Sequence, residues 1–123
     1  MIRNILLVAS GGALGSVSRY LLSRWIQVSQ PGPFPVGTLF VNLTGSLLIG
    51  LLFGYLTKTE TGSEDMRLLM MTGFCGGFTT FSALTLESLH LIRDNKTGLF
   101  FLYISVSLLL GIAATYAGWR IIK

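Results

Sequence analysis

The chain has 123 residues, of which 51% are hydrophobic and only 11% are charged. A soluble domain carries about 25% charged residues, so this composition excludes an ordinary soluble protein. Four membrane spans of about 20 residues each would use most of the length, which leaves no room for a separate soluble domain. The net charge of +4 does not indicate nucleic-acid binding, because the basic residues mostly flank apolar segments and anchor them to headgroups.

The first predicted span covers about residues 4–28. It contains overlapping pairs of small residues spaced four apart, namely Gly11, Gly12, Gly15 and Ser16. Such pairs let another helix approach closely. Arg19 lies about two turns before the end of the span, deep enough that it must snorkel or pair. The stretch that follows, residues 29–35, contains all three prolines and ends the helix.

The second predicted span covers about residues 36–57 and the fourth about residues 99–121. Asn42 lies about two turns inside the second span. A buried amide in lipid needs a partner, so Asn42 either bonds to another helix or faces a polar path. On the fourth span, Tyr103 and Ser107 are four residues apart and share one helix face.

The third predicted span, about residues 66–92, contains the sequence Gly-Phe-Cys-Gly-Gly-Phe-Thr-Thr-Phe-Ser from Gly73 to Ser82. Glycine and β-branched threonine weaken a helix, so this stretch predicts an interruption in the middle of the membrane. Open backbone at that depth is tolerated only where protein buries it or where it lines a watery cavity, and its carbonyls and amides can hold ions. The alternative is an unbroken glycine-rich helix that packs closely against its neighbours.

The basic residues show almost no bias between the two sides of a four-span chain. One side holds Arg3, Lys58, Arg67, Arg120 and Lys123, and the other holds Arg19, Arg24, Arg93 and Lys96. Five against four gives the chain no clear orientation under the positive-inside rule. We therefore predict insertion in both directions and an antiparallel, two-fold symmetric homodimer. The alternative is a fixed orientation set by other features of the chain.

No enzyme motif is present in the sequence. It contains a single histidine, His90, and a single cysteine, Cys75, and it lacks the HExxH, GxSxG and Walker-type patterns. Glu87 and His90 are three residues apart on a helix and could relay protons. The other interpretation is that they lie near the membrane face, where Glu87 pairs with a basic residue.

In the absence of an enzyme motif, the polar and aromatic residues of the spans are candidates to line an ion path. These residues are Thr38, Asn42, Thr79, Thr80, Phe81, Ser82, Tyr103 and Ser107. Hydroxyl and amide donors suit a small anion, and an aromatic ring presents a positive edge. A cation site would need carboxylates or carbonyls, and Glu87 is the only intramembrane acid. The alternative role for each residue is hydrogen bonding between helices.

Three motifs occur in order along these spans: Gly12-Ala-Leu-Gly-Ser-Val-Ser-Arg-Tyr20, Gly37-Thr-Leu-Phe-Val-Asn-Leu-Thr-Gly45 and the Gly73–Ser82 stretch. On these motifs the chain resembles the CrcB/Fluc family of fluoride channels. The resemblance covers essentially the whole length. It implies a dual-topology homodimer in the bacterial inner membrane, with two antiparallel pores that passively export fluoride from the cytoplasm.

The resemblance also implies roles for individual residues. It implies a structural sodium ion at the dimer centre, held by the backbone carbonyls of Gly76 and Thr79. It implies a structural role for Arg19. Glu87 matches an acidic residue that follows the helix interruption in the family. The residues implied to line the fluoride pore are Thr38, Asn42, Thr80, Phe81, Ser82, Leu84, Tyr103 and Ser107.

One position departs from the family pattern. The family typically reads Thr-Thr-Phe-Ser-Thr-Phe, whereas this chain reads Thr-Thr-Phe-Ser-Ala-Leu from Thr79 to Leu84. Phe81 is kept and Leu84 replaces the second ring, so one aromatic edge per chain is lost.

Two other classes of membrane protein compete with this interpretation. A small multidrug-type exporter also has four spans and dual topology, but it needs an intramembrane carboxylate, usually in its first span, and no Asp or Glu occurs there. A non-conducting subunit of a membrane assembly would explain the glycines but not the clustered hydroxyls.

Overall fold

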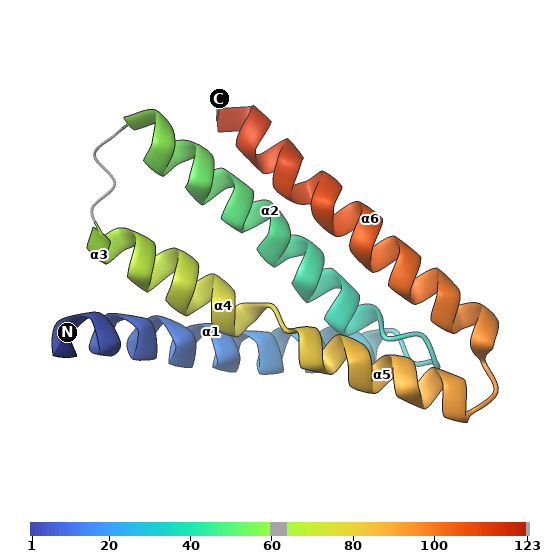
Figure 1. Ribbon diagram of the computed structural model, residues 1–123. Helices are drawn as coiled ribbons and strands as arrows, with labels where there is room; N and C mark the ends of the chain where they lie inside the picture. Colours follow the sequence, from blue (N-terminus) through green and yellow to red (C-terminus); the bar gives the residue numbers. More distant parts are fainter. Residues whose placement is uncertain (60–63, 123) are drawn as a thin grey trace.

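The computed structural model describes residues 1–59 and 64–122, so Lys123 and the middle of the second polar connection lie outside the described residues. Within these ranges the chain is helical and contains no strand, and four helices are long and apolar enough to cross a membrane (Figure 1). The prediction of an all-helical chain with four membrane-capable helices is confirmed.

The first two spans are α1 (Ile2–Ser29) and α2 (Val36–Thr59). The third span runs over Glu64–Arg93 and consists of α3 (Glu64–Met66), the π-helix η1 (Arg67–Cys75), α4 (Gly76–Phe78) and α5 (Phe81–Arg93). The fourth span is α6 (Thr97–Ile122). The spans run up and down, so that the N-terminus, the end of α2 and the C-terminus lie toward one end of the molecule (Figure 1).

The two connections at the opposite end are short. The α5–α6 turn places Asn95 at φ 60°, a left-handed conformation that asparagine tolerates better than most residues. Its amide donates to the Ile92 carbonyl at 3.1 Å, and the Lys96 amide donates to the Leu91 carbonyl at 2.8 Å. This pair of bonds is the Schellman pattern, which satisfies the last carbonyls of α5 and lets the chain reverse within a few residues.

Helix α1 packs against the first half of the third span through backbone contact. Gly11 and Gly15 are buried, and a Cβ atom on either would collide with a carbonyl oxygen, that of Leu69 or that of Phe74 respectively. The prediction that small residues of the first span let another helix approach closely is confirmed. Close backbone approach of this kind is how membrane helices gain van der Waals contact without a hydrophobic driving force.

Helices α2 and α6 form the second close pair. A Cβ atom on Gly50 would collide with the Thr115 carbonyl oxygen, and one on Gly118 would lie 2.5 Å from the Leu47 carbonyl oxygen. The Thr115 hydroxyl also donates to the Ser46 carbonyl at 3.0 Å. The fold therefore consists of two tightly packed helix pairs, with α5 in looser contact with α6.

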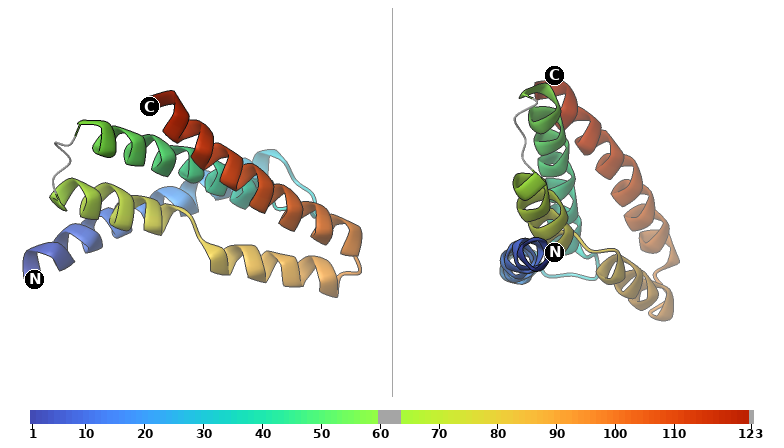
Figure 2. Two further views of the ribbon diagram at one scale, coloured as in Figure 1. Left: turned by 45° about the horizontal axis from the view of Figure 1, so that its top comes forward. Right: turned by 60° about the vertical axis from the view of Figure 1, so that its left-hand side comes forward.

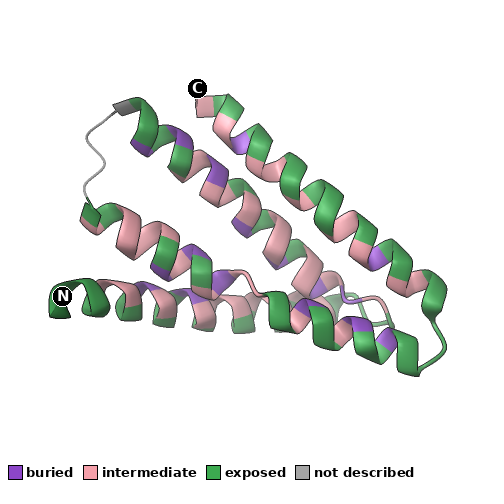
Figure 3. Ribbon diagram, in the orientation of Figure 1, coloured by how far each residue is buried: buried purple, intermediate pink, exposed green. Residues whose placement is uncertain are grey.

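Few large side chains are buried in the chain by itself. Val41 and Tyr103 are fully buried, whereas exposed apolar side chains occur on all four spans (Figure 3). Such a surface has the wrong polarity for water, and lipid or another protein must cover it.

Candidate functional site

The third span leaves the helical conformation at two consecutive threonines. Thr79 has φ −93° and ψ 152°, and Thr80 has φ −150° and ψ 129°, so both are extended between α4 and α5. As a result α5 does not continue the line of α4 (Figure 2). An interruption was predicted from the glycines and threonines of this stretch together; it occurs at the threonines, whereas Gly73, Gly76 and Gly77 lie within helical segments.

The glycines instead allow close packing. A Cβ atom on Gly77 would lie 2.5 Å from the Gly12 carbonyl oxygen, and one on Gly73 would lie 3.0 Å from the Gly11 Cα. The threonines therefore form the extended segment, and the glycines bring the preceding helix against α1.

Asn42 of α2 holds the extended segment in place. Its Oδ1 accepts from the Thr80 amide at 3.1 Å, and its Nδ2 donates to the Thr80 carbonyl at 3.4 Å. One side-chain amide thus satisfies the N–H of an extended residue and makes a second, longer bond to its carbonyl. Asn42 was expected either to bond to another helix or to face a polar path, and the structure shows the bond to another span. This bond uses one of the two N–H donors of Nδ2.

The hydroxyls of the two threonines are used locally. Thr79 Oγ1 donates to the Cys75 carbonyl at 2.9 Å, so the Thr79 side chain is bonded to the end of the preceding helix. Thr80 Oγ1 lies 3.0 Å from Ser82 Oγ and accepts from the Ala83 amide at 3.4 Å, so it caps the start of α5. Ser82 itself is exposed.

A cavity of about 220 Å³ adjoins the extended segment. It brings together four predicted pore residues, Asn42, Thr80, Phe81 and Leu84. The Phe81 side chain is 74% exposed, whereas Leu84 is only 6% exposed. Leu84 therefore contributes to the apolar core as well as to the cavity wall.

A second cavity, of about 490 Å³, lies at the end of the molecule that carries the proline-rich connection. Its lining includes Thr38, Glu87, His90 and Arg24. The Thr38 hydroxyl donates to Glu87 Oε1, which links α2 to α5. Among the described residues Glu87 is thus paired with a hydroxyl, and the expected pairing with a basic residue is not seen.

Two hydroxyls on α6 are buried without a partner. Among the described residues, Tyr103 Oη and Ser107 Oγ are buried and make no hydrogen bond. The Tyr103 ring packs in a cluster with Leu84 and Leu91, and the Phe34 ring meets it edge-on, with centroids 5.6 Å apart and planes at 83°. Leaving a buried hydroxyl unpaired costs about 1–3 kcal/mol, so these two atoms are poised for a ligand or water.

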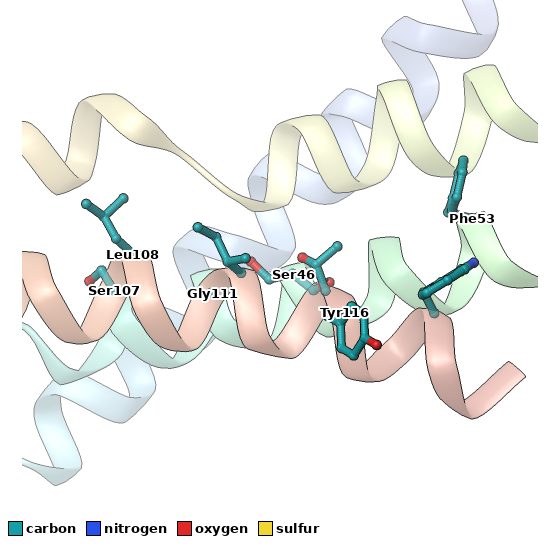
Figure 4. A pocket seen from close by; sticks show the side chains of 9 residues that line it. Ser46, Phe53, Ser107, Leu108, Gly111 and Tyr116 are labelled. Atoms are coloured by element: carbon teal, nitrogen blue, oxygen red, sulfur yellow. Dashed lines mark hydrogen bonds between the residues drawn. The ribbon is translucent and has the colours of Figure 1, made fainter. Parts of the chain in front are cut away.

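A third cavity, of about 570 Å³, follows the face between α2 and α6 (Figure 4). Ser107 lines it together with Ser46 and Thr115, neither of which our sequence analysis singled out. Ser46 lines the 220 Å³ cavity as well. The sequence could have indicated Ser46, because Thr38, Asn42 and Ser46 are spaced four residues apart and therefore share one face of α2.

The carbonyls expected to hold a cation lie beside the extended segment. The amide that would close a helical bond onto the Gly76 carbonyl belongs to Thr80, and it donates to Asn42 instead. Gly76 is exposed, with no side-chain atom within 4 Å of an added Cβ position. Arg19 Nε donates to the neighbouring Gly77 carbonyl at 3.2 Å, which occupies that oxygen.

The described residues contain no group of three or more His, Cys, Asp or Glu side chains that could hold a metal. A cation here would depend on backbone and hydroxyl oxygens, and Gly76 and Thr79 supply carbonyls outside the regular helix ladder. These donors fit a hard monovalent ion such as sodium.

Comparison with known proteins identifies the relatives of this chain. Residues 6–119 match the family described as CrcB-like protein, Camphor Resistance (CrcB). The chain belongs to the CrcB-like family. A fluoride-specific ion channel FluC of Flavobacterium psychrophilum is 45% identical over 121 residues, which covers 98% of each chain. A protein of the same name from Agrobacterium fabrum is 49% identical over 116 residues, or 94% of this chain and 92% of the relative.

A third CrcB-like relative extends the similarity to the full chain. A fluoride-specific ion channel FluC of Chlorobaculum tepidum is 43% identical over 123 residues, which is all of this chain and 97% of the relative. The family match spans all four helices, the extended threonines and the three cavities, so the site described above lies wholly within the family domain.

Proposed function

We propose that this chain is a fluoride-selective channel that lets fluoride leave the cell passively and so lowers its cytoplasmic concentration. One structural observation carries the proposal, namely the two buried hydroxyls of Tyr103 and Ser107 without partners on one face of α6. They lie on a membrane span and offer donors to an anion. The choice of fluoride follows the names of the relatives.

The path follows the polar face of α2 past the three cavities. Thr38, Asn42 and Ser46 line successive cavities along this helix, and Ser107 reaches the last of them from α6. Hydroxyls and the second Asn42 N–H replace the water of fluoride, and the Phe81 ring offers its positive edge. The chemistry is selective binding and release of an ion, without a covalent step, so the protein is a transporter rather than an enzyme.

We further propose that two chains assemble as an antiparallel homodimer with one path per chain, in the bacterial inner membrane. The almost even division of basic residues supports insertion in both directions. The exposed Phe81 ring, beside the extended segment of the third span, supports a second copy that covers this surface near the middle of the membrane. A structural sodium ion at the two-fold axis would be held by the Gly76 and Thr79 carbonyls, and it would fix the two extended segments against each other.

The decisive experiment is anion efflux from proteoliposomes that hold the purified protein. Liposomes loaded with potassium fluoride or potassium chloride are diluted into a potassium-poor solution of an impermeant anion, valinomycin is added so that potassium leaves together with the anion, and release is followed with ion-selective electrodes. We expect rapid fluoride release and chloride release at the rate of protein-free liposomes. Equal release of both anions would overturn the assigned selectivity, and no release of either would overturn the channel.

Orientation is tested separately by cysteine labelling. Gly98 lies in the first turn of α6, and an added Cβ there meets nothing within 4 Å. Gly98→Cys in a Cys75→Ser background is exposed to a membrane-impermeant maleimide on whole cells. We expect about half of the copies to react before permeabilisation. Reaction of all copies or of none would refute insertion in both directions.

A further inference from the structure

The connection between α1 and α2 is organised by one side chain, Gln27. Gln27 Nε2 lies 3.2 Å from the Phe34 carbonyl, 3.4 Å from the Gly32 carbonyl and 3.5 Å from the Gln30 carbonyl. Its Oε1 accepts from the Gly37 amide at 3.0 Å. A single amide on α1 thus contacts both the loop and the first turn of the next helix.

The loop needs such a partner because it cannot bond to itself. Its three prolines have no N–H group, so few backbone donors are present for the carbonyls of this segment. The Gly37 amide lies in the first turn of α2, where helix amides have no intrahelical acceptor. Gln27 supplies the missing donor and the missing acceptor together.

The loop fixed by Gln27 leads to two residues that were predicted to line the pore, Tyr103 and Thr38. The Phe34 ring packs edge-on against Tyr103, whose buried hydroxyl has no partner. Thr38, one residue after Gly37, donates its hydroxyl to Glu87. Phe34 and Gly37 are both hydrogen-bonded to the same Gln27 side chain, so moving that side chain would move both neighbours of the path.

We propose that Gln27 is a positioning residue for ion conduction, acting through Phe34 on the ring of Tyr103 and through Gly37 on Thr38. This inference rests on the proposed channel function. Gln27 also lines the 490 Å³ cavity together with Thr38 and Glu87. Its amide oxygen and nitrogen are both engaged with backbone, so its contribution is the placement of its neighbours.

The test compares Gln27→Met with the wild-type chain in fluoride efflux. Methionine keeps the length of the side chain, adds no charge and removes every hydrogen bond of the amide. We expect the fluoride rate per dimer to fall about tenfold, because displaced path groups lose their alignment with the ion. Gln30→Met is the matched control, since Gln30 is an exposed glutamine at the start of the same loop, and we expect its rate to stay within twofold of wild type.

A background variant separates positioning from a general loss of structure. In Tyr103→Phe, which removes the positioned hydroxyl, adding Gln27→Met should lower the rate less than threefold further, because coupled sites are not additive. Phe34→Leu removes the ring contact with Tyr103 alone, and it should lower the rate less than Gln27→Met, which also releases Gly37.

Each outcome decides between the two claims. Where the wild type conducts fluoride, an unchanged rate in Gln27→Met would overturn the positioning role and leave the channel intact, and an unchanged rate in Phe34→Leu would overturn the route through Tyr103. A full tenfold loss that persists in the Tyr103→Phe background would overturn the route through Phe34 and Tyr103, since the effect would then bypass Tyr103. Absence of fluoride flux in the wild type would overturn the proposed function, and this inference with it.

Discussion

Replacing Asn42 by aspartate should nearly abolish fluoride conduction. Aspartate has the same shape and keeps the oxygen that accepts from the Thr80 amide at 3.1 Å. It replaces the Nδ2 donor with a second oxygen, which would face the Thr80 carbonyl at the position now 3.4 Å away. The substitution therefore keeps one bond, breaks the other and introduces a negative charge beside the 220 Å³ cavity.

The size of the effect follows from these two losses. Loss of a hydrogen bond of this kind costs about 0.5–1.5 kcal/mol. Two like charges about 4 Å apart repel by about 4 kcal/mol at an effective dielectric constant of about 20. The charge repulsion alone would lower the occupancy of the site by fluoride about 10³-fold, because each step of about 1.4 kcal/mol changes a binding constant about tenfold.

The assay is fluoride efflux from proteoliposomes, with the rate expressed per dimer. Asn42→Ala removes both bonds without adding a charge and should therefore retain more flux than Asn42→Asp. Asn4→Asp is the matched control, since Asn4 is an exposed asparagine near the start of α1, and its rate should equal that of wild type. A folded Asn42→Asp dimer that conducts fluoride within tenfold of wild type would refute the placement of Asn42 beside the ion.

Three further predictions concern packing, the cavity and the cation. Gly15→Ala should cost about 1–3 kcal/mol of stability, seen as a lower melting temperature in detergent, because its methyl group has no space; Gly98→Ala, with open space around it, should not lower that temperature. Leu84→Phe should preserve or raise fluoride flux, because the ring enters the wall of an existing cavity; a folded dimer without flux would contradict this. Replacing sodium with N-methylglucamine during purification should shift the protein from dimer to monomer on size exclusion if the Gly76 and Thr79 carbonyls hold sodium, and an unchanged dimer would count against that site.

Hydropathy was enough to predict the four helices, because an apolar run of sufficient length has few alternatives in a membrane. The small residues of the first span likewise predicted its close packing, and Gly11 and Gly15 show it directly. These are local properties of the sequence. Each needs only the spacing of residues within one helix.

The details of the site depend on contacts between distant parts of the chain. The interruption in the Gly73–Ser82 stretch was predicted from its glycines and threonines together, whereas the extended residues are the two threonines, and Asn42 bonds the backbone of Thr80 from another span. Propensity alone does not show which residue finds an outside partner, and that partner decides where the helix ends. The roles of Ser46 and Gln27 depend in the same way on which helices become neighbours.

The backbone contact within each helix pair also limits how the length of these helices can vary. In α1 the glycines at positions 11 and 15 face carbonyl oxygens, and in the α2–α6 pair Gly50 and Gly118 do the same. Deleting one residue from the middle of such a helix would rotate everything beyond it by about 100° and bring side chains against those oxygens. Insertions and deletions inside these helices should therefore be excluded far more strictly than substitutions on their exposed faces.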